Sequence, residues 1–347
     1  MKRSFQHITA LLLGLAMCLS LAACSAEGKS ATKRISTLGG LVDITAYGKN
    51  AESAINEAGL AMTNLDAMVN SFDENSRIYA VNHSGGEAVV VTAQVAAMIE
   101  TARTVSAQTD GALDLTVYQL MDAWGFLSGN YTVPEEDTLT ELLTHMGMDR
   151  VRLAVDQESG DYMLQIPADT QITLDCVARG AATNAAISVL RTKGVKSAVV
   201  NMGGNVQTLG VKPDGSKWNI AIMDPNDRNA YIGYLTLGET AVVTSMPTEL
   251  SFTQRGALFH HIMNPATGMP ASTSLRSVTV VCPDAQMADC LSTAMFVLGE
   301  RKALQYWRDY HGFEMLMITQ DGRIVCTNGL FGTFTQSGGD YQVNYVK

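Results

Sequence analysis

Apolar residues recur along this chain with two spacings, one typical of helices and one typical of strands. A spacing of three to four positions predicts amphipathic helices over residues 52–70, 92–109, 137–146, 178–191, 288–299 and 301–310. Short apolar segments bounded by turn-forming residues predict strands over 35–47, 150–153, 162–166, 171–174, 197–201, 218–223, 233–237, 241–244, 277–281, 314–319 and 323–327. No linker or repeat divides residues 35–347, so we expect one intertwined α+β unit.

Several connections between these elements carry their own expectations. The strand over 35–47 is interrupted at Leu38-Gly39-Gly40, where the backbone can approach a ligand closely. Residues 72–82 are predicted to form a loop, and Asp175-Cys176-Val177 a turn before a helix that begins at Ala178. Gln320-Asp321-Gly322, between two strands, predicts a hairpin.

The first residues are typical of a processing signal. Lys2 and Arg3 precede an apolar segment over 8–21 that is too short to span a membrane comfortably. It ends in Leu21-Ala22-Ala23-Cys24, which resembles a bacterial lipobox, where the chain is cut before a Cys that then carries a lipid. We expect a signal peptide over 1–23, a tether over 24–34 from a lipidated Cys24, and export to the outer face of the cytoplasmic membrane or the periplasm. An ordinary secretory peptide is the alternative.

Charge and cysteine content narrow the possible partners. The formal net charge of the 347 residues is −10, and it becomes −12 without Lys2 and Arg3. An acidic surface argues against nucleic acid and against electrostatic adhesion to anionic lipid, so a lipid anchor would hold the protein to the membrane. Besides Cys24, the expected mature chain has Cys176, Cys282, Cys290 and Cys326 without a CxxC motif, which indicates a core-stabilised fold and leaves one disulfide open.

Candidate chemistry is concentrated between residues 260 and 299. The sequence HHIMNPATGMP over 260–270 combines two histidines with turn-forming Gly and Pro, which predicts both imidazoles at the lip of a rigid loop. Asp289 and Thr293 lie four positions apart on a helix and share one face. A carboxylate with a hydroxyl suits Mg²⁺ or Ca²⁺ better than zinc. Alternatively, Asp289 is an ordinary charge in the first turn of its helix.

Polar residues before three other elements have both a structural and a functional interpretation. Asp114, two positions before Thr116, is most often a helix cap. The glycine pair in 202–205 makes a turn or a phosphate-binding nest. Asp175 is a cap or a ligand for a metal or an amine. Arg179 lies in a first helical turn, where the dipole disfavours a cation, and therefore suggests an anionic partner.

Segments spread over the chain resemble the ApbE family, the FAD:protein FMN transferases. They are STLGGLVDITAYG, the loop over 76–82, GALDLTVYQLMDAWGF, VVNMGGNVQTLGVKPDGSKWNIAIMDP, AVVTS, HHIMNPATGMP and ADCLSTAMFVLG. The resemblance implies an ApbE-like, T-fold-related α+β unit, with central sheets flanked by helices and a cleft for FAD. Family members bind FAD and a divalent cation, usually Mg²⁺, transfer FMN to a Ser or Thr hydroxyl of an acceptor protein, and release AMP. Some members instead hydrolyse FAD to FMN and AMP.

The resemblance also implies roles for individual residues. Asp289, Thr293 and the backbone carbonyl of Ala178 correspond to the metal ligands, with Mn²⁺ or Ca²⁺ as alternatives to Mg²⁺. Residues implied to contact FAD are Leu38, Phe72, Ala112, Leu113, Asp114, Asp175, Arg179, Thr244, Ser245 and Ile262. His261 is implied to exchange a proton with the acceptor hydroxyl or to act in binding alone.

The chain departs from the family pattern at several of these positions. It has Leu38-Gly39-Gly40 for Met-Gly-Thr, Phe72 for Tyr, Arg179 for Lys, Ser245-Met246 for Ser-Gly and Asn264-Pro265 for Asp-Pro. The turn between Asp175 and Gly180 is two residues shorter than usual, which predicts that either Asp175 or the carbonyl ligand is displaced.

We therefore expect an exported, Mg²⁺-dependent FMN transferase that modifies an acceptor protein of a membrane or extracytoplasmic electron-transfer system. A Mg²⁺-dependent FAD pyrophosphatase, or a weak enzyme that mainly holds FAD, is the alternative with the same fold. A non-enzymatic solute-binding lipoprotein is the alternative from another class.

Overall fold

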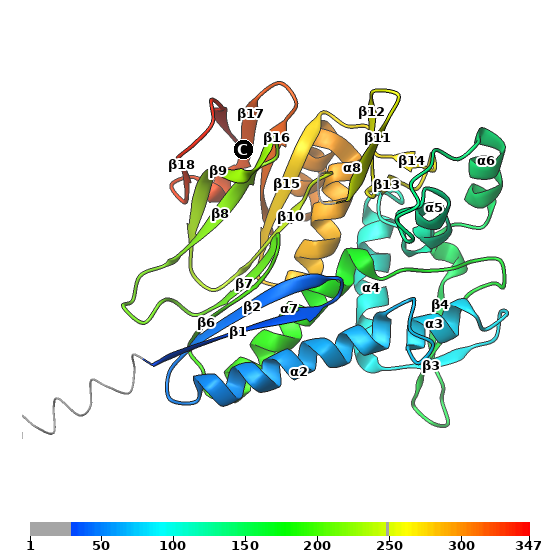
Figure 1. Ribbon diagram of the computed structural model, residues 1–347, viewed down its shortest axis with the longest axis horizontal. Coiled ribbons are helices and arrows are strands. Elements are labelled where there is room, and N and C mark those ends of the chain that lie inside the picture. Colours follow the sequence, from blue (N-terminus) through cyan, green and yellow to red (C-terminus); the bar gives the residue numbers. More distant parts are fainter. Residues whose placement is uncertain (1–28, 248–249) are drawn as a thin grey trace, which may run out of the picture.

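A nine-stranded sheet is the centre of the computed structural model, which describes residues 29–247 and 250–347 (Figure 1). Neighbouring strands are antiparallel except β17 and β19, which are parallel. In spatial order the strands are β1 (Ser30–Thr37), β2 (Gly40–Tyr47), β6 (Ser197–Met202), β7 (Asn205–Leu209), β10 (Ala241–Ser245), β15 (Leu275–Cys282), β16 (Glu314–Thr319), β17 (Arg323–Thr327) and β19 (Gln342–Val346).

A layer of long helices covers one face of this sheet. Helices α2 (Ala51–Val69), α7 (Asp175–Thr192) and α8 (Ala285–Tyr310) lie against the strands, and α4 (Ala93–Gln108) packs on α7 and α8. Helix α4 shows why the sequence folds this way. The Thr92 hydroxyl caps its first turn by accepting a hydrogen bond from Val95 N, and a stripe that includes Met98, Ile99 and Ala102 is fully buried.

A second, smaller sheet covers part of the opposite face. It contains β8 (Trp218–Asp224), β9 (Asp227–Leu237) and β18 (Phe334–Gln336). Its inward side chains, among them Trp218, Ile220 and Leu235, share one buried cluster with Val242 and Leu316 of the large sheet. The molecule therefore has three layers, and apolar residues fill both interfaces.

The remaining elements pack beside the helical layer. They include α3 (Arg77–Asn82), β3 (Val89–Val91), β4 (Arg152–Val155), β5 (Tyr162–Gln165), α5 (Tyr118–Ala123), α6 (Glu136–Thr144), the hairpin β11 (Ser251–Gln254) and β12 (Ala257–His260), and the short pair β13 (Met263–Asn264) and β14 (Met269–Pro270). Short 3₁₀ turns lie at η1 (Leu115–Val117), η2 (Met148–Arg150) and η3 (Asn328–Leu330). Aromatic rings of Trp124, Phe252 and Phe259 join the hairpin to α5, with centroids 5.2–6.4 Å apart. This packing fixes the chain that enters His261.

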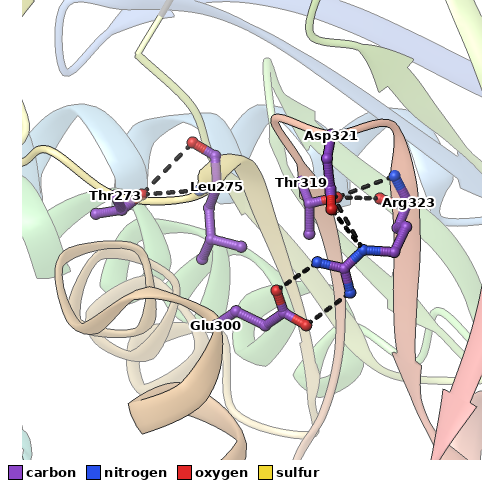
Figure 2. A network of polar contacts seen from close by, with 6 residues as sticks. All are labelled: Thr273, Leu275, Glu300, Thr319, Asp321 and Arg323. Carbon is purple, nitrogen blue, oxygen red and sulfur yellow. Dashed lines mark hydrogen bonds and ion pairs between the residues drawn. The ribbon is translucent and has the colours of Figure 1, made fainter.

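Helix α8 bends at Gly299, and a polar network holds its second half against the large sheet. Gly299 has φ 75° and ψ 168°, which only glycine adopts readily. In the next position Glu300 accepts two hydrogen bonds of 2.9 Å from the Arg323 guanidinium on β17 (Figure 2). The same guanidinium contacts Asp321, whose carboxylate also accepts from Thr319. The bend and the bidentate ion pair together anchor α8 at the β16–β17 hairpin.

Most predicted elements are present, including the hairpins at 320–322 and between β4 and β5, and the α+β class is confirmed. The predicted interruption near Leu38-Gly39-Gly40 is confirmed as a turn, but it separates residues 35–47 into two strands rather than one. The expected tether is too long, because β1 begins at Ser30 and residues 30–34 belong to the sheet. Their alternation of exposed and half-buried positions fits an edge strand with one solvated face. The expected signal peptide and Cys24 lie outside the described residues.

Three further predictions are corrected. Part of the expected loop over 72–82 is helix α3, which Ser76 caps. Helix α7 begins at Asp175, so the expected turn before Ala178 is already helical. The helix dipole favours a carboxylate in this first position. Residues 171–174 form no strand, because their backbone bonds elsewhere: Ile172 pairs with the Asn82 side chain, and Thr173 N donates to Leu115 O.

Within the described residues no helix is long and apolar enough to cross a membrane. The four cysteines there are free thiols, so the disulfide left open by the sequence does not form among them.

Candidate active site

One cleft of about 530 Å³ brings the site residues together, and its size is in the range of small-molecule sites. Its wall includes every residue named from the sequence as metal-binding, flavin-binding or proton-transferring: Leu38, Phe72, Ala112, Leu113, Asp114, Asp175, Ala178, Arg179, Thr244, Ser245, His261, Ile262, Asp289 and Thr293. These residues come from segments far apart in the chain.

Asp289 and Thr293 lie on α8, one turn apart, where this helix crosses α7. Asp289 is only 7% exposed, and its Oδ2 accepts a 2.8 Å hydrogen bond from Gly180 N on α7. The helices approach so closely that a Cβ on Gly180 would lie 2.1 Å from Ala285 O. Glycine at position 180 therefore allows the contact that places the Asp289 carboxylate at the cleft.

The oxygen donors at this crossing fit a hard divalent cation. Asp289 supplies a buried carboxylate, and Thr293 a hydroxyl one turn later. Among the residues that the structure describes, no three His, Cys, Asp or Glu side chains gather as a metal cage. Mg²⁺ is often held by one or two carboxylates together with substrate phosphates and water, so such a cage is not required. Ala178 is buried on the first turns of α7 and also lines the cleft.

The two adjacent histidines face different surroundings, so the expectation that both imidazoles lie at the lip of a rigid loop is wrong. His261 lines the cleft, where its backbone N and its Nδ1 both lie against Leu250 O, at 3.1 and 3.2 Å. His260 is 7% exposed, packs edge-on against Phe296, and its Nε2 donates to Ala271 O at 3.2 Å. Burial, with a smaller contribution from His261, lowers the pKa of His260 to about 4. Successive side chains of an extended segment point to opposite sides, which separates the pair.

Leu38 lies in the β1–β2 turn with φ 50°, a conformation that is costly for a residue with a side chain. Asp66 on α2 holds this turn: its Oδ2 accepts from Leu38 N at 2.8 Å and from Thr37 Oγ1 at 3.0 Å. Asp66 also lines the cleft. Thus a carboxylate on the helical layer positions the first cleft residue of the chain.

Phe72 supplies an exposed aromatic ring to the cleft wall. Its side chain is 61% exposed, and its ring centroid is 6.4 Å from that of Tyr118. Asn70 Oδ1 accepts a 3.0 Å hydrogen bond from Phe72 N and fixes the backbone after α2. An exposed ring in this position can stack on a planar ligand.

Asp114 has both the structural and the cleft position that the sequence left open. It caps the turn that follows, because its Oδ1 accepts from Thr116 N at 2.8 Å and from Thr116 Oγ1 at 2.7 Å. Burial raises the pKa of this carboxyl, although the bonds to Thr116 act in the opposite direction. The cap thus fixes a partly desolvated carboxyl beside Ala112 and Leu113 in the cleft wall.

The region that is two residues shorter than the family pattern is continuous helix. Asp175 is exposed at the start of α7, Arg179 is half-buried one turn later, and both line the cleft. The shortening therefore leaves both charged side chains on the same wall as Asp289. Gly203 and Gly204, in contrast, form the tight β6–β7 turn with positive φ and do not line this cleft, which favours the structural interpretation of that motif.

Sequence reasoning missed part of the wall. The additional residues include Asp66, Asn70, Ser71, Met121, Phe126, Leu127, Thr173, Cys176, Met246, Leu250, Met263 and Pro265. Asp66 had the only usable signal, since it is a carboxylate near the end of a helix, where the dipole does not favour it.

Together, an exposed aromatic ring, a buried carboxylate beside a hydroxyl, a guanidinium and an imidazole on one cleft define a class of enzyme. It is one that acts on a ligand carrying both a planar ring and anionic groups, and its oxygen donors would suit a hard divalent cation.

Comparisons with known proteins make this class specific. The ApbE family model matches residues 38–317, and the chain belongs to the ApbE family. The FAD:protein FMN transferase of Treponema pallidum is 27% identical over 338 residues, which cover 92% of this chain and 93% of that protein. The FAD:protein FMN transferase of Escherichia coli is 28% identical over 267 residues, covering 75% of this chain and 76% of that protein.

Solved structures of the family have the same fold. The crystal structure of the ApbE protein from Thermotoga maritima aligns with a TM-score of 0.80 and 28% identity, over 88% of this chain and 99% of that chain. The apo flavinyl transferase ApbE of Pseudomonas stutzeri aligns with a TM-score of 0.78 and 26% identity, over 90% and 99%.

Proposed function

We propose that this protein transfers the FMN half of FAD to a Ser or Thr hydroxyl of an acceptor protein and releases AMP. The observation that carries the proposal is the cleft itself, which joins Asp289 and Thr293 on α8 to His261 after β12. Family membership and the names of its relatives support the same activity.

The reaction is a phosphoryl transfer between oxygen atoms. The acceptor hydroxyl oxygen forms a bond to the phosphorus of the FMN half, and the bond from that phosphorus to the bridging oxygen of the pyrophosphate breaks. AMP leaves with the bridging oxygen, and the hydroxyl proton passes to a base. Because a carbonyl only accepts hydrogen bonds, His261 donates its Nδ1 proton to Leu250 O. Its Nε2 then carries the lone pair that takes the hydroxyl proton.

The other residues of the wall hold the substrate in register. Leu38 and Phe72 flank the flavin ring, Ala112, Leu113 and Asp114 line the nucleotide, and Thr244, Ser245 and Ile262 close the pocket. Arg179 and Asp175 contact the polar part of FAD from α7. A Mg²⁺ ion held by Asp289, Thr293 and the Ala178 carbonyl would neutralise charge on the pyrophosphate, and Mn²⁺ or Ca²⁺ are the alternatives to test.

The site of action in the cell is part of the proposal. The lipobox-like sequence before Cys24 supports export and a lipid anchor, with an acceptor in a membrane or extracytoplasmic electron-transfer system. A Cys24→Ala variant expressed in a bacterial host should lose incorporation of labelled fatty acid and leave the membrane fraction. Retention of label in that variant would contradict the anchor.

The activity is tested by incubating the purified protein with FAD, Mg²⁺ and a peptide that carries an acceptor Thr. The expected result is release of AMP together with a peptide heavier by one FMN, and both products should disappear with EDTA or in Asp289→Ala. AMP released while the peptide stays unmodified would favour the alternative, a pyrophosphatase. FAD binding without AMP would leave a flavin-binding protein and overturn the proposal.

A further inference from the structure

Three hydroxyl groups meet where β10 ends against α8. Ser245 Oγ lies 2.8 Å from Ser292 Oγ and 3.3 Å from Thr293 Oγ1. Ser292 Oγ in turn donates a 3.0 Å hydrogen bond to Asp289 O, one turn back on the same helix. Ser292 is fully buried, and Ser245 and Thr293 are half-buried. Ser245 and Thr293 line the cleft, whereas Ser292 lies behind them.

The carbonyl at one end sets the direction of every bond in this chain of hydroxyls. A carbonyl oxygen only accepts, so the Ser292 proton points to Asp289 O. Ser292 must then accept from Ser245, whose single proton is used in that bond. The contact between Ser245 and Thr293 can only form if Thr293 donates to Ser245 Oγ. The Thr293 proton is therefore directed at Ser245, away from any cation that the Thr293 oxygen binds.

We infer that Ser292 and Ser245 are positioning residues, which orient the Thr293 hydroxyl so that its lone pairs serve a divalent cation held with Asp289. The inference rests on the proposed metal site and adds the residues that prepare it. A hydroxyl binds a cation through its oxygen lone pairs. A partner that accepts a hydrogen bond from the hydroxyl increases the negative charge on its oxygen. Asp289 takes part twice, since its carboxylate faces the cleft while its carbonyl fixes the hydroxyl chain.

Removal of Ser292 would release this order. Without its oxygen, the Ser245 proton has Thr293 Oγ1 as its nearest hydroxyl partner, 3.3 Å away. Ser245 would then donate to the lone pairs that the cation needs. The two serines thus act on the cation through Thr293 and not by direct contact.

Cation binding itself tests the inference, independently of turnover. Mn²⁺ is titrated into the purified protein and followed by electron paramagnetic resonance, and Mg²⁺ binding is measured by calorimetry. Ser292→Ala and Ser245→Ala should each lower the affinity for the cation by about 10-fold or more, which is the usual effect of losing a group that supports a metal ligand. Ser245→Thr, which keeps the hydroxyl, should restore most of the affinity.

Ser277→Ala is the matched control, because Ser277 is a buried serine on β15 whose hydroxyl has no hydrogen-bond partner within the described residues. It should bind the cation as the unaltered protein does. FAD affinity in EDTA should be unchanged in Ser292→Ala, because Ser292 lies behind the cleft wall.

Two results would overturn the inference and a third would go further. Cation affinity that is unchanged in both alanine variants, or an equal loss of FAD affinity in EDTA, would reduce Ser292 to a structural residue. An unaltered protein that binds no Mn²⁺ or Mg²⁺, with or without FAD, would overturn the proposed metal site as well.

Discussion

His260 and His261 are neighbours in the chain, yet their chemistry differs because they face opposite sides of it. His261 donates to Leu250 O and opens on the cleft, while His260 is packed against Phe296 with its pKa lowered to about 4. The unfolded chain protonates a histidine near pH 6.5, so a buried neutral His260 couples folding to pH.

Stability should therefore fall as the pH decreases from about 6.5 to about 4, because in this window the unfolded state binds a proton that the folded His260 does not. Above pH 6.5 the neutral form is present in both states, and the contribution of His260 is complete. Between pH 7 and 4.5 the free energy of unfolding should decrease by roughly 2–3 kcal/mol more than in His260→Gln. Urea denaturation of both proteins at the two pH values measures this difference, and equal pH dependence would contradict the buried neutral state.

His261→Gln should separate catalysis from binding. The variant retains a polar side chain but cannot act as the base, so the rate of flavinylation of the acceptor peptide should fall by roughly 10²–10⁴-fold. FAD affinity, measured by fluorescence, should change little. A variant with unchanged rate would assign His261 to binding alone.

Asp66→Ala removes the acceptor of two hydrogen bonds from the Leu38 turn, at 2.8 and 3.0 Å. Leu38 then loses the partner that holds it at positive φ in the cleft wall. We expect FAD affinity to fall about 10-fold, equivalent to about 1.4 kcal/mol, with little change in the rate at saturating FAD. Asp309→Ala is the control, since Asp309 accepts hydrogen bonds from Gln305 on an exposed part of α8, away from the cleft. Unchanged FAD affinity in Asp66→Ala would show that the Leu38 turn keeps its conformation without these two hydrogen bonds.

At the scale of helices, the crossing of α7 and α8 decides where the Asp289 carboxylate lies. Only glycine fits at position 180, because a Cβ there would lie 2.1 Å from Ala285 O and 2.6 Å from Ala285 C. Gly59, within α2, is different: a Cβ there would meet only Ile35 and Ile44 side chains at 3.5–3.9 Å. Gly180 is therefore required by the packing of its helix, whereas Gly59 is not.

Gly180→Ala should lower the free energy of unfolding by about 1–3 kcal/mol, since a backbone carbonyl cannot move aside as a side chain does. It should also lower the affinity for Mn²⁺, because separation of the helices breaks the hydrogen bond from Gly180 N to the Asp289 carboxylate. Gly59→Ala should instead be neutral or stabilise the protein by up to about 1 kcal/mol through helix propensity. Thermal unfolding and Mn²⁺ titration of both variants measure the contrast, and equal effects would refute the tight crossing.

At the scale of the whole molecule, local pattern predicts elements well where packing follows the pattern. The stripe on α4 and its Thr92 cap are local features, and both occur as expected. Residues 171–174 have a strand-like sequence but pair with Asn82 and with the backbone at Leu115, which only the folded chain brings near. The start of β1 at Ser30 was missed for the same reason, because polar edge residues need the neighbouring β2 to become a strand.

The candidate site shows the same division. The family resemblance placed Asp289, Thr293 and His261, and one cleft holds all three. It gave no indication of Asp66, which acts on Leu38 across 28 positions of sequence, or of Ser292, whose value depends on a hydroxyl of β10. Hydrogen bonds between distant segments leave no periodic trace in sequence, so the roles of these two residues become visible only in three dimensions.

The cleft wall extends in sequence from Leu38 to Thr293, and this has a consequence for how the protein matures. A fragment that lacks either end of this span lacks part of the site, so FAD is expected to bind only a folded chain that includes residues 38–293. At 100 times its dissociation constant, FAD would stabilise that fold by about 2.7 kcal/mol. Contacts between segments distant in sequence are slow to form, because they close long loops. Binding of FAD would therefore indicate that the fold is complete. A product truncated before Asp289 would not bind FAD, and it could not compete with intact enzyme for a scarce supply.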